Sequence, residues 1–428
     1  MLSPWGYRLR RFIVLGMALS ISAAAAGAPS ASSEQRWVAA WATSPTAADP
    51  NADEPLLNIR QQTVRQRVRL SIGGPRLRVQ LSNEFGSAPL LIGAATVALS
   101  QDPETVKAES LRSLTFGGRS SVIIPAGAPV LSDVVEVPVS AGAEISISLY
   151  FPERVVTPTI HALALKRATV SAPGDFTRAA RMEISSTSES SIAITAVLVL
   201  AGPGQKLVVA FGDSITDGDG STVDGDRSWP SALARRLAKR ASAGPAIAIV
   251  NEGIAGNRLL ADGFGINALG RSALARFDHD VLAIPGVTHV VLLEGLNDLG
   301  FPGASLGGQP LGGPGETPTV EDLIAAYQQL TMRAHVHGVK VIGGTLTPFE
   351  GVTFEGYYSE AKERARQRLN AWIRTSGAFD GVIDFDAVVR DQDHPSRMRA
   401  SYASPDHLHP NDAGYRAMAD AVDLSLFD

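Results

Sequence analysis

The sequence predicts an all-β, sandwich-like region over residues 36–200, followed by an α/β region with a parallel sheet over residues 205–428. Two observations predict this division. In the first region, apolar residues alternate with polar residues between turn signals, which is typical of antiparallel strands with one buried face. In the second region, short continuous apolar runs alternate with helical patterns, which is typical of a parallel sheet covered by helices on both faces. We therefore expect two domains.

Composition narrows the classes of protein. The chain has 428 residues, of which 45% are hydrophobic and 19% are charged, so it has enough apolar surface for a large core. The net charge is −5 and no long block of lysine and arginine occurs, which argues against nucleic acid as a partner. The chain contains no cysteine, so disulfide scaffolds, cysteine-ligated metal centres and thiol nucleophiles are excluded.

The first segment has the composition of a targeting signal. Three arginines within residues 8–11 precede an apolar run over residues 12–26, and small residues follow. This order predicts a secretory signal peptide over residues 1–28. We expect export to the periplasm or the medium, by the Sec or the twin-arginine route, with no stable membrane insertion after cleavage. An uncleaved anchor is the alternative, but the run is short against the ~20 residues of a membrane span.

In the β-rich region, the clearest pattern surrounds the turn signal Gly73-Gly74-Pro75. Apolar residues alternate with arginines or polar residues over residues 64–72 before it and 77–82 after it. This pattern predicts a β-hairpin with one solvated face. The arginines at positions 65, 67, 69, 76 and 78 are interpreted as that solvated face, with a polyanion-binding row as the alternative. Further strands are predicted at residues 135–139, 145–151 and 192–200.

In the α/β region, five apolar runs predict the strands of the sheet, at residues 207–211, 246–250, 289–293, 339–343 and 382–385. Helical patterns are found between or after them, at residues 230–240, 319–337, 359–375 and 411–424. The second helix has the clearest ends, because Thr319 and Asp322 form a capping-box pattern and Gly338 follows its last turn. Ligands of such sheets bind beyond the carboxyl ends of the strands, so the residues just after the apolar runs are the candidates for a site.

Four polar segments carry the candidate chemistry. They are Gly212–Gly218 (GDSITDG), Asn251–Asn257 (NEGIAGN), Glu294–Asp298 (EGLND) and Asp406–Pro410 (DHLHP). Together they supply a serine hydroxyl, a glycine N–H, a side-chain amide, and an acid with an imidazole. A serine becomes a nucleophile when an imidazole takes its proton, and a carboxylate holds that imidazole in the right tautomer. A developing oxyanion needs preorganised donors. These residue types therefore point to nucleophilic catalysis at the strand ends.

With these four segments in this order, the chain resembles the SGNH, or GDSL, hydrolase family over about residues 205–428. The resemblance implies a flavodoxin-like three-layer α/β/α domain and a carboxylic ester hydrolase activity. The first motif reads GDSI rather than GDSL, a minor departure because the position after the serine is not itself catalytic. A secreted β-domain followed by this catalytic domain also resembles a branch of the family associated with xylan-degrading bacteria.

The resemblance also implies the roles of individual residues. It makes Ser214 the nucleophile, His409 the general base and Asp406 the residue that orients the base. It makes the backbone N–H groups of Ser214 and Gly256, together with the side-chain amide of Asn297, the oxyanion hole. Glycine at position 256 lets the backbone approach the substrate closely.

Each of these residues also has a structural interpretation. The alternative for Ser214 is a helix N-cap, for Gly256 a turn glycine, for Asn297 a helix cap and for Asp406 a turn residue. His407 is the alternative imidazole and is expected to be exposed. Three neighbouring acids are expected to have structural roles: Asp213, Glu294 and Asp298.

No cofactor and no metal are needed for this chemistry. Acidic residues within residues 217–224 hint at a calcium loop. However, Thr222 stands where such a loop requires glycine, and Ser228 where it requires a bidentate glutamate. A cation at this loop stays an alternative.

Three segments are expected to shape the substrate site: residues 299–318, 345–358 and 388–405. Four aromatic residues in the second of them are candidates for stacking on a sugar or contacting an acyl group, with packing of the loop as the alternative: Phe349, Phe354, Tyr357 and Tyr358. The sequence contains no long apolar helix of the kind that forms an interfacial lid, which disfavours a lipase.

These observations predict an exported serine esterase. We expect it to act on short-chain acyl esters of a small molecule or a polysaccharide, with acetyl groups on plant polysaccharide such as xylan as the favoured substrate. A lipase, a lysophospholipase or an acyltransferase with the same triad is the alternative enzyme, and an inactive glycan-binding protein is the alternative of another class. The β-domain is expected to buttress the catalytic domain rather than to bind glycan. The oligomeric state is not predicted.

Overall fold

The computed structural model describes residues 35–49, 54–240 and 246–428. The predicted signal peptide, residues 1–28, lies outside the described residues. Residues Gln35–Asp428 form one compact unit, and the division of that unit into two domains stays a prediction. Among the described residues, no helix combines the length and the apolar character needed to cross a membrane.

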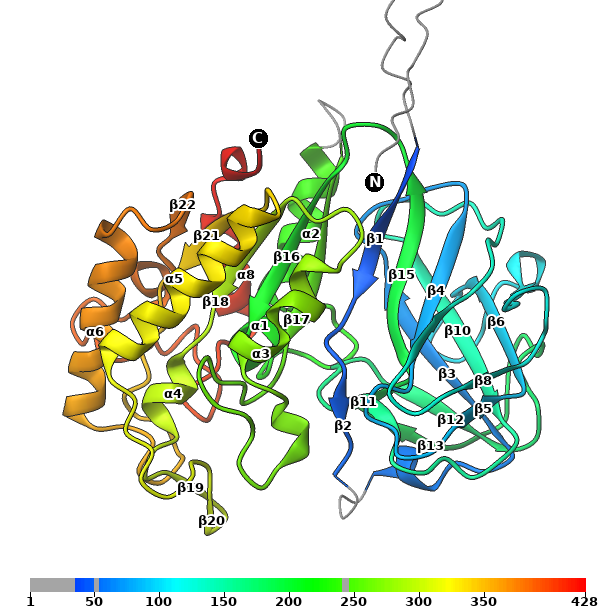
Figure 1. Ribbon diagram of the computed structural model, residues 1–428, viewed down its shortest axis with the longest axis horizontal. Helices are drawn as coiled ribbons and strands as arrows, with labels where there is room; N and C mark the ends of the chain where they lie inside the picture. Colours follow the sequence, from blue (N-terminus) through cyan, green and yellow to red (C-terminus); the bar gives the residue numbers. More distant parts are fainter. Residues whose placement is uncertain (1–34, 50–53, 241–245) are drawn as a thin grey trace, which may run out of the picture. The chain divides into compact units, whose positions relative to one another are not determined.

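The β-rich region contains two main antiparallel sheets (Figure 1). The first has the order β1 (Arg36–Ala42), β15 (Ile194–Ala201), β4 (Leu77–Ser82) and β9 (Pro129–Leu131). The second has the order β13 (Ile184–Ser188), β12 (Ala168–Pro173), β3 (Gln62–Arg69), β10 (Glu144–Phe151), β6 (Ala94–Leu99) and β7 (Arg112–Ser113). Smaller sheets join β14 (Ser191–Ile192), β11 (Thr159–His161) and β2 (Thr46–Ala47), and β5 (Leu90–Ile92) with β8 (Val122–Ile124). Apolar side chains of both main sheets share one core, as in a sandwich.

The predicted hairpin around Gly73-Gly74-Pro75 is wrong. β3 belongs to the six-stranded sheet and β4 to the four-stranded sheet, so the glycine-rich segment carries the chain from one sheet to the other. Alternation marks the buried face of a strand but not its partner. Val64 of β3 and Val79 of β4 are both fully buried in the common core, which explains why both strands show the same pattern.

The predicted solvated face of arginines is wrong for Arg65 and Arg67, whereas Arg69 and Arg76 are exposed, as predicted. Arg65 is only 1% exposed, and its guanidinium donates a 2.7 Å hydrogen bond to the carbonyl of Ala179. Arg67 is also buried and pairs with Glu144 at 3.1 Å and with Asp224 at 2.5 Å. Alternation reveals that this face is polar, but not that other segments of the chain cover it. The guanidinium groups of these two residues are occupied by internal acceptors rather than offered to a polyanion.

The other predicted strands have mixed outcomes. Residues 145–151 lie in β10, as predicted. The strand predicted at residues 192–200 is divided at Ala193, which has a φ of 61°, into β14 and β15, and these belong to different sheets. Residues 135–139, all of which are described, contain two isolated bridges instead of a strand, at Val135 and Val139. Pro138 between them has no N–H to donate to a ladder, which limits the pairing of this segment.

The α/β region contains a five-stranded parallel sheet in the order β17-β16-β18-β21-β22. Its strands are β16 (Lys206–Gly212), β17 (Ile247–Gly253), β18 (His289–Leu293), β21 (Lys340–Gly344) and β22 (Gly381–Ile383). In chain order this is the 2-1-3-4-5 arrangement of flavodoxin-like folds, as predicted. The last strand ends earlier than predicted, because Asp384 caps helix α7 (Phe385–Val389).

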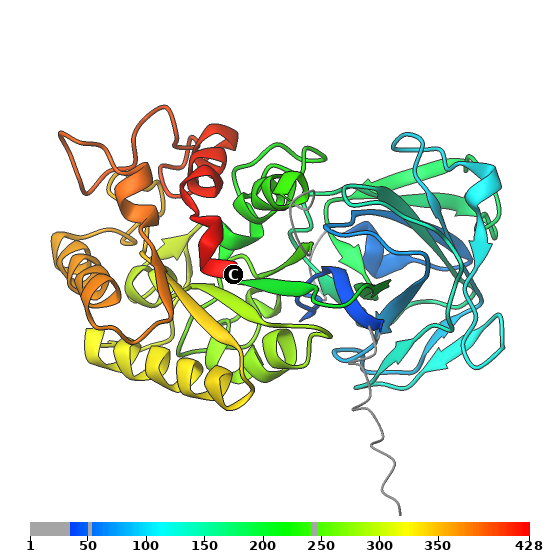
Figure 2. The same ribbon diagram turned by 90° about the horizontal axis from the view of Figure 1, so that it is seen from above.

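Helices cover both faces of this sheet (Figure 2). α2 (Trp229–Arg240) and α8 (Asp412–Ala421) pack together on one face, and α5 (Val320–Val336) and α6 (Glu360–Thr375) lie on the other. The shorter helices are α1 (Ser214–Asp217), α3 (Ala273–Phe277) and α4 (Leu296–Gly300). Thr319 and Asp322 form the predicted capping box of α5. Because α1 and α4 begin directly after β16 and β18, their first residues lie at the carboxyl edge of the sheet.

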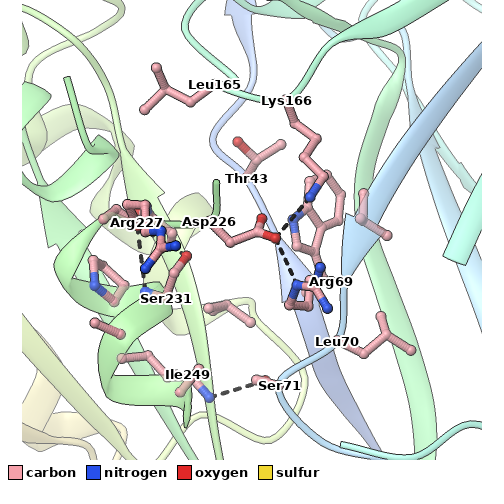
Figure 3. Close-up of a pocket in the computed structure, with 18 of the residues that line it drawn as sticks. Thr43, Arg69, Leu70, Ser71, Leu165, Lys166, Asp226, Arg227, Ser231 and Ile249 are labelled. Carbon is pink, nitrogen blue, oxygen red and sulfur yellow. Dashed lines mark hydrogen bonds and ion pairs between the residues drawn. The ribbon is translucent and has the colours of Figure 1, made fainter. Parts of the chain in front are cut away.

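The β-rich region covers the edge strand β17 of the parallel sheet. The Ile249 N–H donates to Ser71 Oγ at 3.2 Å (Figure 3). Nearby, the Ala39 N–H of β1 donates to the carbonyl of Pro285 at 3.0 Å. An uncovered edge strand is a template for pairing with other chains, and the Ser71 contact together with the packing of β1 against β17 protects it.

Ion pairs also join the two regions, around a cavity of about 500 Å³. The carboxylate of Asp226 accepts from Arg69 at 2.7 Å and from Lys166 at 2.8 Å (Figure 3). His161 and Asp217 line the same cavity. The cavity therefore has walls from both regions.

Candidate active site

Ser214 is the first residue of a short helix at the carboxyl end of β16. Gly212 ends the strand, and a Cβ there would lie 2.1 Å from the carbonyl oxygen of Leu293, so this position needs glycine. Asp213 caps the helix, because its carboxylate accepts from the Ile215 N–H at 2.9 Å. The structural alternative of Ser214 as the N-cap is therefore wrong, and its hydroxyl is available to other partners.

The Ser214 hydroxyl faces His409. Ser214 Oγ lies 2.8 Å from His409 Nε2, and His409 Nδ1 lies 2.6 Å from Asp406 Oδ2. A carboxylate only accepts hydrogen bonds, so Nδ1 carries the proton and Nε2 accepts from the hydroxyl. His407, the alternative imidazole, is exposed. The fold thus brings together a hydroxyl and an imidazole that are 195 residues apart in the chain.

Asp406 is held by several donors. Its Oδ1 accepts from Ser404 Oγ at 2.6 Å, from the Leu408 N–H at 2.9 Å and from the His409 N–H at 3.0 Å. Partial burial acts to raise the pKa of Asp406, but the hydrogen bonds and the charge of His409 outweigh it and hold this pKa well below its usual range. Asp406 therefore organises its turn through Oδ1, as the structural alternative predicts. Its carboxylate stays charged, and Oδ2 faces the imidazole.

The charges around His409 favour its protonated form. Burial acts to lower the pKa of His409, but the hydrogen bond to Asp406 and the charges of Asp219 and Asp213 outweigh it and raise this pKa above 6.5. Asp219 Oδ2 lies 3.6 Å from His409 Nε2. Burial raises the pKa of Asp213 itself to about 7. The site therefore stabilises an imidazolium, the form that the base takes once it has accepted a proton.

The amide of Asn297 is fixed at both ends. Its Nδ2 donates to the carbonyl of Asn257 at 2.8 Å, and its Oδ1 accepts from the Tyr357 hydroxyl at 2.8 Å. These two partners decide which end of the amide is nitrogen. One Nδ2 hydrogen remains for another acceptor.

Gly256 lies in a tight turn. The Asn257 N–H donates to the carbonyl of Ile254 at 3.0 Å and closes the turn, and the Ile254 N–H donates to the carbonyl of Gly212 at 3.0 Å. Gly256 has a φ of 72°, and a Cβ there would lie 2.4 Å from Leu269 Cδ2. The turn-glycine interpretation is therefore right, and a role in an oxyanion hole stays a proposal beside it.

Residues 210–417 match the model of the GDSL-like Lipase/Acylhydrolase family. This part of the chain belongs to that family. The chain is accordingly a carboxylic ester hydrolase. No curated protein matches it.

Solved structures of similar proteins cover about half of this GDSL hydrolase. A lipolytic protein of the G-D-S-L family from Desulfitobacterium hafniense is 21% identical and covers 50% of this chain and 96% of its own, with a TM-score of 0.36. An acetyl xylan esterase from Geobacillus stearothermophilus is 21% identical, with coverages of 51% and 92% and a TM-score of 0.38. An aryl esterase from M. smegmatis is 15% identical, with coverages of 50% and 95% and a TM-score of 0.38. These scores are low, so family membership rests on the sequence match.

Beneath the GDSL motif lies a buried arginine that the sequence did not reveal. Arg276 of α3 donates to the carbonyls of Gly212 at 2.9 Å and Glu252 at 2.8 Å, and it pairs with Asp280 at 2.9 Å. Its guanidinium carbon lies 4.0 Å from the centre of the Phe211 ring. Arg276 therefore ties the ends of β16 and β17 together. The only signal was an i,i+4 spacing of Arg276 and Asp280, which many surface helices share.

The aromatic candidates divide into two groups. Phe349 and Tyr357 are fully buried, so for them the packing alternative is right. Tyr357 was missed as a partner of Asn297, because nothing in the sequence links positions 60 residues apart. Phe354 and Tyr358 are partly exposed and stay candidates for substrate contact.

The neighbouring acids make structural contacts, as expected. Asp298 accepts from the N–H groups of Leu259 at 2.6 Å and Leu260 at 2.9 Å, and burial raises its pKa to about 6. Glu294 is fully buried 3.8 Å from Arg276, and burial raises its pKa well above the usual value.

Acids of the calcium-loop alternative have protein partners. Asp217 lies 3.0 Å from His161 Nε2, and Asp224 pairs with Arg67 and Arg167. Within residues 35–49, 54–240 and 246–428, no three or more His, Asp or Glu side chains are grouped as metal ligands would be.

Proposed function

We propose that this GDSL hydrolase is an exported serine esterase that cleaves short-chain acyl esters through an acyl-enzyme on Ser214. The observation that carries the proposal is the pair of contacts from Ser214 Oγ to His409 Nε2, at 2.8 Å, and from His409 Nδ1 to Asp406 Oδ2, at 2.6 Å. Export is supported by the arginines, the apolar run and the small residues of segment 1–28.

In the first half of the reaction, Ser214 Oγ attacks the ester carbonyl while His409 Nε2 takes its proton. The charged carboxylate of Asp406 stabilises the imidazolium that forms. The carbonyl oxygen becomes an oxyanion, for which the N–H groups of Ser214 and Gly256 and the free Nδ2 hydrogen of Asn297 are the proposed donors. The imidazolium then protonates the departing alcohol, which leaves the acyl group on Ser214.

In the second half, water replaces the alcohol. His409 takes a proton from the water as its oxygen attacks the acyl carbonyl, and the same donors receive the oxyanion. Collapse of this intermediate releases the carboxylic acid and returns the proton to Ser214 Oγ. One imidazole therefore acts as base and as acid in each half, which is why its pKa matters to the rate.

We propose acetylated plant polysaccharide such as xylan as the substrate. The support is the resemblance of the layout, a β-rich region before a GDSL region, to the xylan-associated branch of the family, together with the predicted export. The partly exposed rings of Phe354 and Tyr358 are candidates for stacking on a sugar. The β-rich region is proposed as an accessory domain that supports the catalytic one.

The test compares the wild type with Ser214→Ala and with Ser376→Ala, a control at the exposed serine that caps the C-terminus of α6. The assays are hydrolysis of p-nitrophenyl acetate, butyrate and octanoate, and release of acetate from acetylated xylan. We expect the wild type and the control to prefer acetate and to deacetylate xylan. We expect Ser214→Ala to lose about three powers of ten in kcat or more while folding normally.

Each part of the proposal has its own contrary result. Wild-type turnover by folded Ser214→Ala ends the assignment of the nucleophile. Ser214-dependent turnover of small esters without acetate release from xylan removes the polysaccharide. A preference for octanoate or for emulsions favours the lipase alternative, and transfer of the acyl group to an added alcohol favours the acyltransferase.

A further inference from the structure

A buried side-chain pair connects the β-rich region to the helix that begins with Ser214. His161 of β11 places Nε2 3.0 Å from Oδ1 of Asp217, the last residue of α1, and Nδ1 3.0 Å from the carbonyl oxygen of Ser44. The side chains of His161 and Asp217 are only 4% and 6% exposed. Both ring nitrogens thus face oxygen atoms that accept hydrogen bonds, one of them on a carboxylate.

A neutral imidazole has only one N–H, but each ring nitrogen of His161 faces an oxygen acceptor. Two hydrogen bonds therefore need one further proton, on the imidazole or on the carboxylate. Burial raises the pKa of Asp217. Burial acts to lower the pKa of His161, but the facing carboxylate outweighs it and raises this pKa. Both directions favour retention of the extra proton by the pair. The contact is therefore a charge-assisted hydrogen bond between buried side chains, which is strong and directional.

The second oxygen of Asp217 reaches the glycine turn. Asp217 Oδ2 accepts from the Ala255 N–H at 3.2 Å, and Ala255 directly precedes Gly256. Asn251 Nδ2 donates to the carbonyl of Asp217 at 3.1 Å. A Cβ on Gly253 would lie 2.3 Å from the Asp217 backbone nitrogen, so glycine there lets the end of α1 lie against this segment. Asp217 is thus held by the turn through its side chain and by the end of β17 through its backbone.

The peptide that carries the Gly256 N–H needs such fastening. The turn from Ile254 to Asn257 is closed by one hydrogen bond between its end residues, and Gly256 occupies its third position with a φ of 72°. Turns of type I and type II differ mainly by a flip of their central peptide, and glycine at the third position tolerates both. In this turn the central peptide joins Ala255 to Gly256. A flip reverses the direction of the Gly256 N–H.

We propose that His161 is a positioning residue for ester hydrolysis: through Asp217 it anchors the Ala255 N–H and so fixes Ala255, from which the next peptide aims the Gly256 N–H at the oxyanion. The inference rests on the proposed function, because it gives the β-rich region a part in the same site. His161 touches no reacting atom. It acts by fixing the residue that anchors the turn.

A second interface contact of the same kind provides a matched control. Asp226 pairs with Arg69 and Lys166 of the β-rich region across the same cavity (Figure 3). It therefore joins the same two regions, but its side chain binds the β-rich region and its carbonyl binds Arg235 of α2, away from the glycine turn. Loss of the Asp226 pair weakens the interface without releasing the turn.

The experiment uses the full chain with His161→Phe, which fills the space but donates no hydrogen bond, His161→Gln, which keeps an N–H donor, and Asp226→Asn. The readouts are kcat and KM for p-nitrophenyl acetate and the Ki of phenylboronic acid, which forms a tetrahedral adduct with a nucleophilic serine. We expect His161→Phe to lower kcat roughly 10- to 100-fold and to raise the Ki of phenylboronic acid by a similar factor. The KM should stay within about threefold of the wild-type value. We expect His161→Gln to recover most of the loss, and Asp226→Asn to leave kcat and Ki within about threefold.

Contrary results are equally defined. Folded His161→Phe with wild-type kcat and Ki overturns the inference, and so does an equal loss of kcat in Asp226→Asn, because the effect then belongs to the interface in general. If His161→Phe does not fold, the double variant His161→Phe/Asp217→Asn, which leaves no buried charge unpaired, takes its place under the same criteria. Ser214→Ala is measured alongside. If Ser214→Ala keeps full turnover, the proposed function is overturned. If Ser214→Ala loses activity while His161→Phe keeps the wild-type kcat and Ki, only this inference is overturned.

Discussion

Asp219 provides a direct test of how charge sets the working pH of the site. Its carboxylate lies 3.6 Å from His409 Nε2, and its side chain is 40% exposed. Asp219→Asn removes the charge and keeps the shape. The backbone contacts of Asp219 do not depend on the side chain, since its N–H donates to the carbonyl of Ser214 and its carbonyl accepts from Tyr415. The variant therefore changes the field at His409 with little change in structure.

The size of the effect follows from Coulomb's law. Two unit charges 3.6 Å apart interact by about 1 kcal/mol at the dielectric constant of water, the appropriate limit for a half-exposed carboxylate. Without this attraction the imidazolium loses about that much stabilisation, so the pKa of His409 should fall. His409 acts as base only when it is neutral, and its raised pKa places the acid limb of activity above the ordinary histidine value. The charge removal should therefore move the acid limb to lower pH.

The assay is the pH dependence of kcat/KM for p-nitrophenyl acetate, which reports the pKa of the free enzyme. The matched control is Asp412→Asn, because the Asp412 side chain is also 40% exposed and its carboxylate binds Thr222 instead. We expect the limb to shift in Asp219→Asn and to stay in place in the control. A limb that does not move in Asp219→Asn, or that moves to higher pH, would refute the assignment of Asp219 as a charge acting on His409.

Three further substitutions test the supports of the site and the core. Tyr357→Phe removes the hydrogen bond to Asn297 Oδ1, and we expect kcat to fall about tenfold with KM little changed; an unchanged kcat would show that the amide is held without the hydroxyl. Gly256→Ala places a methyl group 2.4 Å from Leu269 Cδ2 at a φ of 72°, so steady-state assays should find most activity lost, and retention of wild-type kcat would contradict the strain expected at this turn. Arg65→Met leaves several buried carbonyls without a donor, and urea unfolding should lose about 2–4 kcal/mol of stability, whereas a change below about 0.5 kcal/mol would mean that water replaces the guanidinium.

The parallel sheet could be predicted because its strands are buried on both faces. Continuous apolar runs such as residues 207–211 and 289–293 fit neither an amphipathic helix nor a strand with one solvated face, and β16 and β18 follow them closely. The sandwich was harder. Alternation identified β3 and β4 as strands but could not show that they belong to different sheets. It also could not show that Arg65 is covered, because the carbonyls that bind it include two from positions more than 100 residues away.

The candidate site divides in the same way. Ser214, His409 and the other motif residues are recognisable because one reaction requires all of these residue types. Four such motifs rarely occur in this order by chance. The residues that hold them in place belong to no such motif. Arg276 and His161 lie in no motif, and the sequence marks Tyr357 as a candidate for substrate contact rather than as a partner of Asn297. Each of the three acts through a partner distant in sequence. Only the folded chain shows that the tyrosine fixes an amide, that the arginine ties two strand ends, and that the histidine reaches the helix of the nucleophile.

The covered edge of β17 limits how this enzyme can be shortened. The Ile249 N–H of β17 donates a hydrogen bond to Ser71 Oγ, and β1 packs against the same strand. A chain that begins near residue 205 would leave this strand open, with unpaired backbone groups beside newly exposed apolar side chains. Such a surface recruits strands from neighbouring molecules, so the shortened enzyme should self-associate rather than remain monodisperse. In this hydrolase, the α/β region would then depend on the β-rich region for its solubility.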